Sequence, residues 1–263
     1  MKLGFCGGIE QASLIKSWGF DYLEPALAPI AGLSEPDFAV VLNEYEKCGI
    51  PCLVCNGFLP RSVQIVGLNV DNAANERYVR GALARASRLG AATVVFGSSG
   101  SRSIPAGFPA GLAWTQLTAF AAMAAPIAAA YGITLAFEPL NAIECNFINR
   151  AGEAWLLVQA VQQDHFKVLA DYYHMMVERE DLAVLGFIGQ DLCHVHTATL
   201  QGRKIPGFRD RLNQENLIGA LQNAGYTGNL SIEAGSWLDL NAEACESLAM
   251  FRQLIAKAAS AGC

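Results

Sequence analysis

The stretch ITLAFEPLN, residues 133–141, is an apolar run that ends in a carboxylate, Glu138. Three further segments repeat this arrangement, in which an acidic residue or a histidine follows an apolar run: ADYYHM at 170–175, HVHT at 194–197 and SIEAG at 231–235. A charge at the end of a buried strand is unusual unless a partner compensates it. Carboxylates and imidazole are ligands that suit Mn, Co, Mg or Zn. The four segments therefore predict a single metal at the mouth of a barrel.

The rest of the chain alternates strand-like and helix-like segments around these four. Strands are predicted at 2–6, 22–24, 50–55, 92–96, 133–138, 166–171, 192–197 and 230–233. Helices are predicted at 10–18, 35–47, 72–89, 111–131, 151–162, 175–185, 214–224 and 241–259. Eight such units in 263 residues predict an α/β fold, a (β/α)8 TIM barrel formed by one domain over residues 1–263. A doubly wound sheet would show a glycine-rich phosphate turn after the first strand, and Cys6-Gly7-Gly8 does not complete one.

Strand periodicity predicts which side chains face the barrel axis. If Glu138 points inward, Ala136 does too, while Leu135 and Phe137 face the helices. His194 and His196 share a face, so both could point inward, and we choose His196 as the ligand because it lies nearer the mouth. His194 is then a supporting or packing residue. The two long connections, 56–71 and 97–111, follow strands and are therefore expected on the face that carries the active site, as a substrate lid.

Composition limits the classes of function. Hydrophobic residues make up 52% and charged residues 16%, which is typical of one extended core. The net charge is −6 without a block of Lys or Arg, so nucleic acid is not an expected partner. The N-terminus has an apolar stretch too short for a signal peptide, and we expect no run long enough to span a bilayer, which predicts a cytoplasmic protein.

The eight cysteines, Cys263 included, are scattered without a repeated spacing. Cys52 and Cys55 form a CxxC pair, which could be redox-active or bind zinc. However, residues three apart in a strand point to opposite faces, and no second CxxC completes a zinc site. We therefore predict buried free thiols.

Each of the four site residues also has an ordinary structural interpretation. An acidic residue at a strand end is usually a helix N-cap or a solvated loop charge, so Asp171 could cap the next helix and Glu233 could pair with an arginine. A single histidine in this position is more often a core residue than a ligand. The coincidence of such residues at four strand ends favours the metal site.

The residues around these strand ends resemble the xylose isomerase-like TIM barrels, and within them the ketose 3-epimerases that act on D-tagatose and D-psicose. The matching segments are 137–149, 170–178, 194–207 and 231–235. The family pattern EPLN-x-x-E-x-N-F is matched by residues 138–147, and its D-x-x-H-M by residues 171–175. Its H-x-G-E-x-N-R-x-x-P-G is similar to residues 196–207, but the loop is one residue longer and Ala198-Thr199 replaces Gly-Glu.

This resemblance implies the metal ligands Glu138, Asp171, His196 and Glu233. Glu138 and Glu233 would also be the catalytic acid/base pair, and the sugar would be bound by Glu144, His174 and Arg203. The chemistry agrees, because a divalent ion stabilises the enediolate formed beside a ketone, and two carboxylates can exchange roles as base and acid. The resemblance further implies a small sugar as substrate, Mn²⁺ as first choice of metal with Co²⁺, Mg²⁺ or Zn²⁺ as alternatives, and a homodimer or homotetramer.

Other functions on this scaffold stay open. Aldose–ketose isomerisation of the hydroxypyruvate isomerase type, inosose dehydration and sugar lyase chemistry all begin by removing a proton beside a carbonyl; Glu144 and His174 favour the epimerase. A non-catalytic sugar-binding barrel would not need all four ligands. An endonuclease IV-like nuclease would need more histidines than the four present, His165, His174, His194 and His196.

Overall fold

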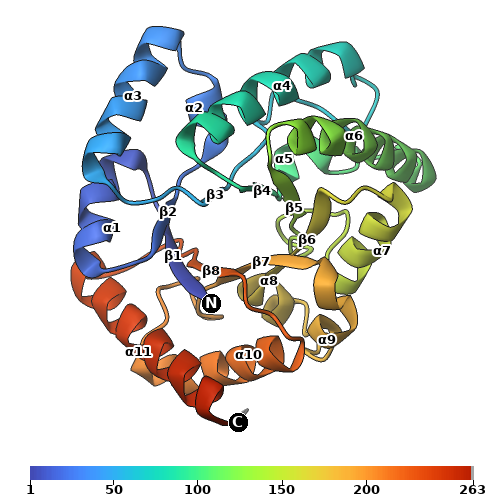
Figure 1. The fold of residues 1–263 in the computed structure, drawn as a ribbon. Coiled ribbons are helices and arrows are strands. Elements are labelled where there is room, and N and C mark those ends of the chain that lie inside the picture. The colour runs from blue at the N-terminus through green and yellow to red at the C-terminus, as the bar shows by residue number, and fades with distance from the viewer. Residues whose placement is uncertain (262–263) are drawn as a thin grey trace.

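A computed structural model describes residues 1–261, with side chains described through residue 258. Its centre is a sheet of eight parallel strands in the order β2-β1-β8-β7-β6-β5-β4-β3 (Figure 1). The strands are β1 Lys2–Cys6, β2 Tyr22–Glu24, β3 Val54–Cys55, β4 Thr93–Phe96, β5 Thr134–Phe137, β6 Phe166–Asp171, β7 Leu192–Thr197 and β8 Asn229–Ile232. Isolated bridges Leu23↔Cys52 and Ala26↔Asn56 join β2 to β3, so the barrel is nearly closed. The predicted TIM barrel is confirmed.

The helices form the outer layer around the strands (Figure 1). They are α1 Ala12–Trp18, α2 Leu27–Ala31, α3 Glu35–Cys48, α4 Asn72–Leu89, α5 Ser99–Arg102, α6 Ala110–Ala130, α7 Ala151–Val161, α8 Tyr172–Val177, α9 Val184–Ile188, α10 Arg211–Asn223 and α11 Leu240–Ala261. Three short 3-10 turns complete the outer layer: η1 Ile9–Gln11, η2 Gly189–Asp191 and η3 Phe208–Asp210. Helix α4 has the predicted bounds because Asp71 accepts a hydrogen bond from Ala74 N at its start and Gly90 adopts a left-handed φ of 93° at its end.

The predicted helix over 175–185 is wrong. The chain forms α8 directly after β6, because the Asp171 carboxylate caps it by accepting a hydrogen bond from the His174 N–H (3.1 Å). Arg179 then adopts a left-handed φ of 52° and ends this segment, and α9 begins only at Val184. The predicted strand over 50–55 is also too long, since β3 contains only Val54 and Cys55. Pro51 in that run has no N–H to donate to a neighbouring strand.

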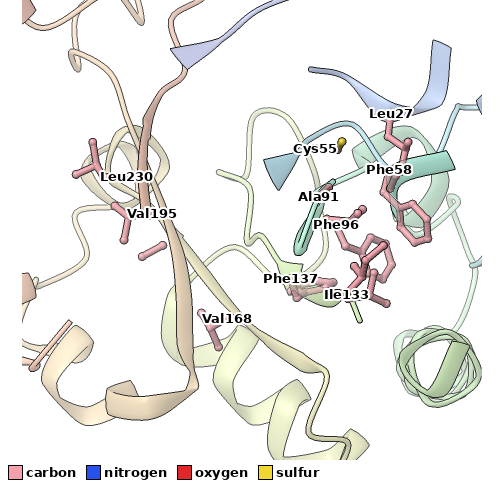
Figure 2. Packing of buried hydrophobic residues seen from close by; sticks show 14 of the residues in the cluster. Leu27, Cys55, Phe58, Ala91, Phe96, Ile133, Phe137, Val168, Val195 and Leu230 are labelled. Carbon is pink, nitrogen blue, oxygen red and sulfur yellow. The ribbon is translucent and has the colours of Figure 1, made fainter. Parts of the chain in front are cut away.

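The predicted division of strand residues between the two faces is confirmed. A small cluster inside the barrel contains Ala136 of β5 together with Tyr22, Val54, Val95 and Leu169. Leu135 and Phe137 belong to the outer core between strands and helices. Figure 2 shows Phe137 beside Phe96 and Ile133 in this layer, and the rings of Phe96 and Phe137 meet edge to face with centroids 5.2 Å apart. The interior positions near the mouth are therefore left to polar residues.

Helix α6 corrects the expectation that no run is long enough to cross a membrane. Of the described helices, it alone reaches that length and apolar character, over 21 residues. In the fold it is part of the barrel's outer layer, where it packs against α4 and β5 and buries Leu117 and Phe120.

The cysteine pair is only partly as predicted. Cys52 and Cys55 are free and buried, but their sulfur atoms lie 3.6 Å apart and do not point to opposite faces. The reason is that β3 begins at Val54, so Cys52 is outside the regular strand whose alternation the prediction assumed. Cys263 lies outside the described residues.

Candidate metal centre

Four acidic and imidazole side chains converge at the carboxyl ends of consecutive strands. Glu138, Asp171, His196 and Glu233 follow or end β5, β6, β7 and β8, and each offers a ligand atom within 4.8 Å of the others. His196 Nδ1 lies 3.3 Å from Glu138 Oε1 and 3.6 Å from Glu233 Oε2. Asp171 and His196 are buried, and the Glu233 side chain retains 22% of its exposure. The structure thus brings together all four residues that the sequence predicted as ligands.

Strand register explains why these residues meet. In the parallel sheet Asp171 is the register partner of His196, and His196 is the partner of Ser231. Glu233 is two residues beyond Ser231 and so faces the same side, one step nearer the mouth. Glu138 occupies the matching place after β5, where its N–H donates to Phe96 O of β4 (3.1 Å). The strand register therefore determines the point on the barrel from which each of these side chains extends.

The three residues predicted to bind a substrate lie beside this cluster. Arg203 forms an ion pair with Glu233, and its Nη2 lies 3.5 Å from Asp171 Oδ2. Its Nη1 is 3.5 Å from Glu144 Oε1, and its guanidinium carbon lies 4.9 Å from the centroid of the Tyr173 ring. One arginine thus lies within 3.5 Å of carboxylates that end or follow three strands, β5, β6 and β8.

His174 presents an unpaired donor to the same space. Its Nδ1 accepts hydrogen bonds from Asn141 N (3.2 Å) and Asn141 Nδ2 (2.7 Å). Because Nδ1 accepts, a neutral ring carries its proton on Nε2. That nitrogen is buried without a hydrogen-bond partner and lies 3.8 Å from Asp171 Oδ2. A buried donor without a hydrogen-bond partner lowers the stability of the protein, and an oxygen atom of a bound small molecule beside it would provide the missing acceptor.

The surroundings of the two glutamates in the cluster shift their pKa values in opposite directions. Burial, together with the charge of Glu233, raises the pKa of Glu138. Burial also acts to raise the pKa of Glu233, but the charges of His196 and Arg203 outweigh it and hold that pKa at about 2. Burial lowers the pKa of His196, but Glu24 and Glu233 outweigh this and raise it. In the metal-free protein the cluster therefore keeps an ionised Glu233 next to a more easily protonated Glu138.

Two buried charged residues near the centre were not assigned to the site by sequence reasoning. Glu24 at the end of β2 is 0% exposed and contacts His194 and His196. Its position, an acid that closes an apolar strand, is the same signal that identified the four ligands. Arg102 of α5 is also 0% exposed and donates to the backbone of Gly97 and Glu138. Sequence reasoning placed Arg102 only in the long connection at 97–111, because no strand-end pattern marks a residue of the short helix α5.

The two long connections, which follow β3 and β4, are hydrogen-bonded to one another. Leu59 N donates to Ser98 Oγ (3.1 Å), and Ile65 N donates to Ser101 O (3.0 Å). A movement of either connection would therefore involve the other. Their function as a substrate lid stays a prediction.

The donor set fits a divalent cation. It offers three carboxylates and the Nδ1 atom of His196, whose other nitrogen, Nε2, is occupied by a 2.7 Å contact with Glu24 Oε1. Hard oxygen ligands with one imidazole suit Mn²⁺, Co²⁺, Mg²⁺ or Zn²⁺, and do not favour the soft ions that thiolates select.

The fold and this site define the class of protein. Residues 12–254 match the model of the xylose isomerase-like TIM barrel family, and the chain belongs to that family. Its resemblance to the family is therefore confirmed.

More particular relatives are ketose 3-epimerases. The chain is 27% identical over 239 residues to an L-ribulose 3-epimerase from Mesorhizobium japonicum, which covers 89% of this chain and 76% of the relative. It is 34% identical over 110 residues to a D-psicose 3-epimerase from Ruminiclostridium cellulolyticum, a match that spans only 41% of this chain and 37% of the relative.

Solved structures agree on the fold. The D-psicose 3-epimerase of Clostridium cellulolyticum, crystallised with D-tagatose, superimposes with a TM-score of 0.86 at 21% identity, covering 97% of this chain and 99% of that one. The 3-keto-D-glucoside 4-epimerase of E. coli gives a TM-score of 0.79 at 22% identity, covering 96% and 99%.

Proposed function

We propose that this protein is a divalent-metal-dependent sugar epimerase that inverts C3 of a ketose. The observation that carries the proposal is the cluster of Glu138, Asp171, His196 and Glu233 with the unpaired His174 Nε2 and the Arg203 guanidinium beside it. The names of the relatives, L-ribulose 3-epimerase and D-psicose 3-epimerase, support the same reaction.

The four clustered residues would hold the metal, with Mn²⁺ as the first candidate. A bound divalent ion would supply a Lewis acid that polarises the ketone and makes the neighbouring C–H proton more acidic. Glu138 and Glu233 would supply the base and the acid: one carboxylate takes the proton from C3, and the other returns a proton to the opposite face of that carbon. Reversal of the reaction exchanges their roles.

The surrounding residues would bind and orient the sugar. His174 Nε2, which has no hydrogen-bond partner in the protein, would donate to a substrate oxygen, and Glu144 would accept from a hydroxyl. Arg203 would place positive charge near the oxygen that becomes negative when the proton leaves. Because Arg203 already contacts Glu233 and Asp171, it would also limit how far the two carboxylates separate.

A second candidate reaction is supported by one finding. The chain is 33% identical over 73 residues to a 3-dehydro-D-guloside 4-epimerase of Escherichia coli, a match covering 27% of this chain and 28% of that protein. Inversion at C4 of a 3-keto sugar uses the same proton transfer beside a carbonyl. Aldose–ketose isomerisation, inosose dehydration and lyase chemistry share this first step too, and differ in which bond changes afterwards.

The test is activity on free ketoses after removal and return of the metal. Protein dialysed against EDTA should be inactive, and Mn²⁺ or Co²⁺ should restore formation of the C3 epimer, as resolved by chromatography. Glu233→Gln should stay inactive with Mn²⁺, whereas Glu76→Gln, a change on the exposed face of α4, should behave as wild type. Epimerisation that survives complete chelation would overturn the metal-dependent function.

We also propose that the protein assembles as a homodimer or homotetramer, which sedimentation velocity would test. A monomer at all accessible concentrations would contradict this.

A further inference from the structure

Glu24 is a fully buried carboxylate below the candidate metal centre. It ends β2, and its two oxygens contact two imidazoles of β7: Oε1 lies 2.7 Å from His196 Nε2, and Oε2 lies 3.0 Å from His194 Nε2. Isolation of a carboxylate from water costs several kcal/mol unless hydrogen bonds compensate it. The two imidazoles provide that compensation, and among the described residues they are its only ion-pair partners.

The remaining contacts of Glu24 connect it to β8. Ser231 Oγ donates to Glu24 Oε2, and the Tyr22 hydroxyl lies 2.7 Å from the same Oγ. His194 and His196 stand nearly perpendicular, with ring centroids 4.9 Å apart. Strands β2, β7 and β8 thus share one buried polar network inside the barrel.

This network determines which nitrogen of His196 is free to bind a metal. An ionised carboxylate only accepts hydrogen bonds, so Nε2 of His196 is the donor in the short contact with Glu24. Nδ1 is on the other side of the ring, 3.3 Å from Glu138 and 3.6 Å from Glu233. When the ring carries one proton, the shorter contact retains it on Nε2, and the Nδ1 lone pair is directed at the cluster.

We infer that Glu24 is a positioning residue that holds His196 in the tautomer and orientation that present Nδ1 to the metal, with His194 and Ser231 holding Glu24 in turn. This inference rests on the proposed function, because it assumes that His196 is a ligand. Glu24 itself would touch neither metal nor substrate.

A competing interpretation is a second metal site. Cys6, Glu24 and His196 also offer ligand atoms within 4.8 Å of one another, and His196 would then bridge two ions. The direct 2.7 Å contact between Glu24 and His196 favours a hydrogen bond instead. The two interpretations predict different stoichiometries, one or two ions per chain.

The test is Mn²⁺ titration of metal-free protein by calorimetry, comparing wild type with Glu24→Gln. The glutamine keeps the shape but offers one acceptor to two imidazole donors, so one ring must lose its partner or turn. Loss of such a supporting partner typically weakens metal binding by about 10- to 100-fold. We expect that decrease at one ion per chain, with kcat largely recovered at saturating Mn²⁺. Tyr22→Phe is the matched control, since it removes a hydroxyl of the network without touching either imidazole contact, and should bind Mn²⁺ like wild type.

A second measurement does not depend on the variant. In ¹⁵N-histidine spectra of the Zn²⁺-loaded wild type, His196 should be protonated at Nε2 and bound to metal through Nδ1. Protonation at Nδ1 with metal bound through Nε2 would overturn the inference. Unchanged Mn²⁺ affinity in Glu24→Gln would also overturn it. So would binding of two ions per wild-type chain of which Glu24→Gln loses one. If the wild-type protein binds no divalent ion, the proposed function is refuted as well. If the wild-type protein is active and Glu24→Gln binds Mn²⁺ with the same affinity, only the inference about Glu24 is refuted.

Discussion

The contacts of Arg102 determine how much stability the protein should lose when this residue is replaced. The side chain is entirely buried, and its Nε donates to Gly97 O (2.6 Å). Its two terminal nitrogens donate to Glu138 O (3.0 Å) and to Phe147 O. The guanidinium carbon lies 4.9 Å from the Phe137 ring centroid. One side chain thus joins the backbone after β4 to two points of the backbone after β5, including the peptide of a candidate ligand.

Arg102→Met would leave three carbonyl groups without this donor: those of Gly97 and Glu138, which are buried, and that of Phe147, which is partly buried. Each unsatisfied buried acceptor costs about 1–3 kcal/mol, and part of that cost is recovered because a buried charge is removed as well. We therefore expect the free energy of unfolding to fall by about 3–5 kcal/mol, among the largest effects of a single substitution. With a urea m-value of about 3 kcal/mol/M for a chain of this size, the midpoint should shift by about 1 M or more.

The assay is urea unfolding of metal-free protein followed by circular dichroism, with Mn²⁺ affinity measured on the folded variant. The free energy of unfolding of Arg102→Lys should lie between those of wild type and Arg102→Met, because a single ammonium group cannot donate to all three carbonyls as the planar guanidinium does. Arg80→Met is the control, since Arg80 is exposed and pairs only within α4; its loss should cost less than about 0.5 kcal/mol. A loss below about 1 kcal/mol in Arg102→Met, with unchanged Mn²⁺ affinity, would show that Arg102 does not hold the backbone after β4 and β5 in place.

Four further predictions follow from the site. Glu138→Gln and Glu233→Gln should each lower kcat by at least about 100-fold while the circular dichroism spectrum is unchanged, because each removes one proton-transfer group; near-native turnover in either would make the acid/base assignment wrong. Mn²⁺ at 100 times its dissociation constant should stabilise the metal-free protein by about 2.7 kcal/mol in urea unfolding, and no shift would argue against a site formed only in the folded state. Arg203→Met should lower kcat/KM on the accepted ketose by about 100-fold or more, as expected for loss of a charged donor near a developing oxyanion, and a change in Mn²⁺ affinity alone would assign it to the metal instead. In metal-free protein the pKa of Glu233 is about 2, below its ordinary value. The ionised carboxylate therefore stabilises the folded protein above about pH 4.5, and this stabilisation is lost as the pH falls towards 2. The difference in free energy of unfolding between wild type and Glu233→Gln, measured by urea unfolding, should shrink over that interval and not between pH 6 and 8.

The parts of the fold that could be predicted are those where one local signal decides the structure. The bounds of β6, β7 and α4 agree with their predictions because apolar runs and capping residues mark both ends. The helix over 175–185 failed because two competing effects are invisible in apolar periodicity. Asp171 starts a helix earlier by capping it, and the left-handed Arg179 then ends it. The contact between Cys52 and Cys55 was missed for a similar reason, since the strand was assumed to begin before Cys52.

The site was predictable as far as it depends on strand ends. Parallel strands bring their carboxyl ends to one face, so Glu138, Asp171, His196 and Glu233 could be grouped without knowing any distance. Glu24 has the same local signal, but its importance depends on the closure of the barrel, which brings β2 opposite two histidines of β7. That tertiary relation is absent from the sequence of either strand.

Proton exchange at C3 of a ketose can be observed directly in D2O. Mn²⁺-loaded protein would be incubated with a panel of free ketoses while ¹H NMR follows the C1, C3 and C4 protons. We predict that at least one ketose loses its C3 proton signal by exchange with deuterium and that its C3 epimer accumulates with deuterium at C3, while Glu233→Gln shows neither change. Exchange at C1 with formation of an aldose, or exchange at C4 alone, would contradict epimerisation at C3. A metal-loaded protein that exchanges no proton of any ketose would contradict it as well.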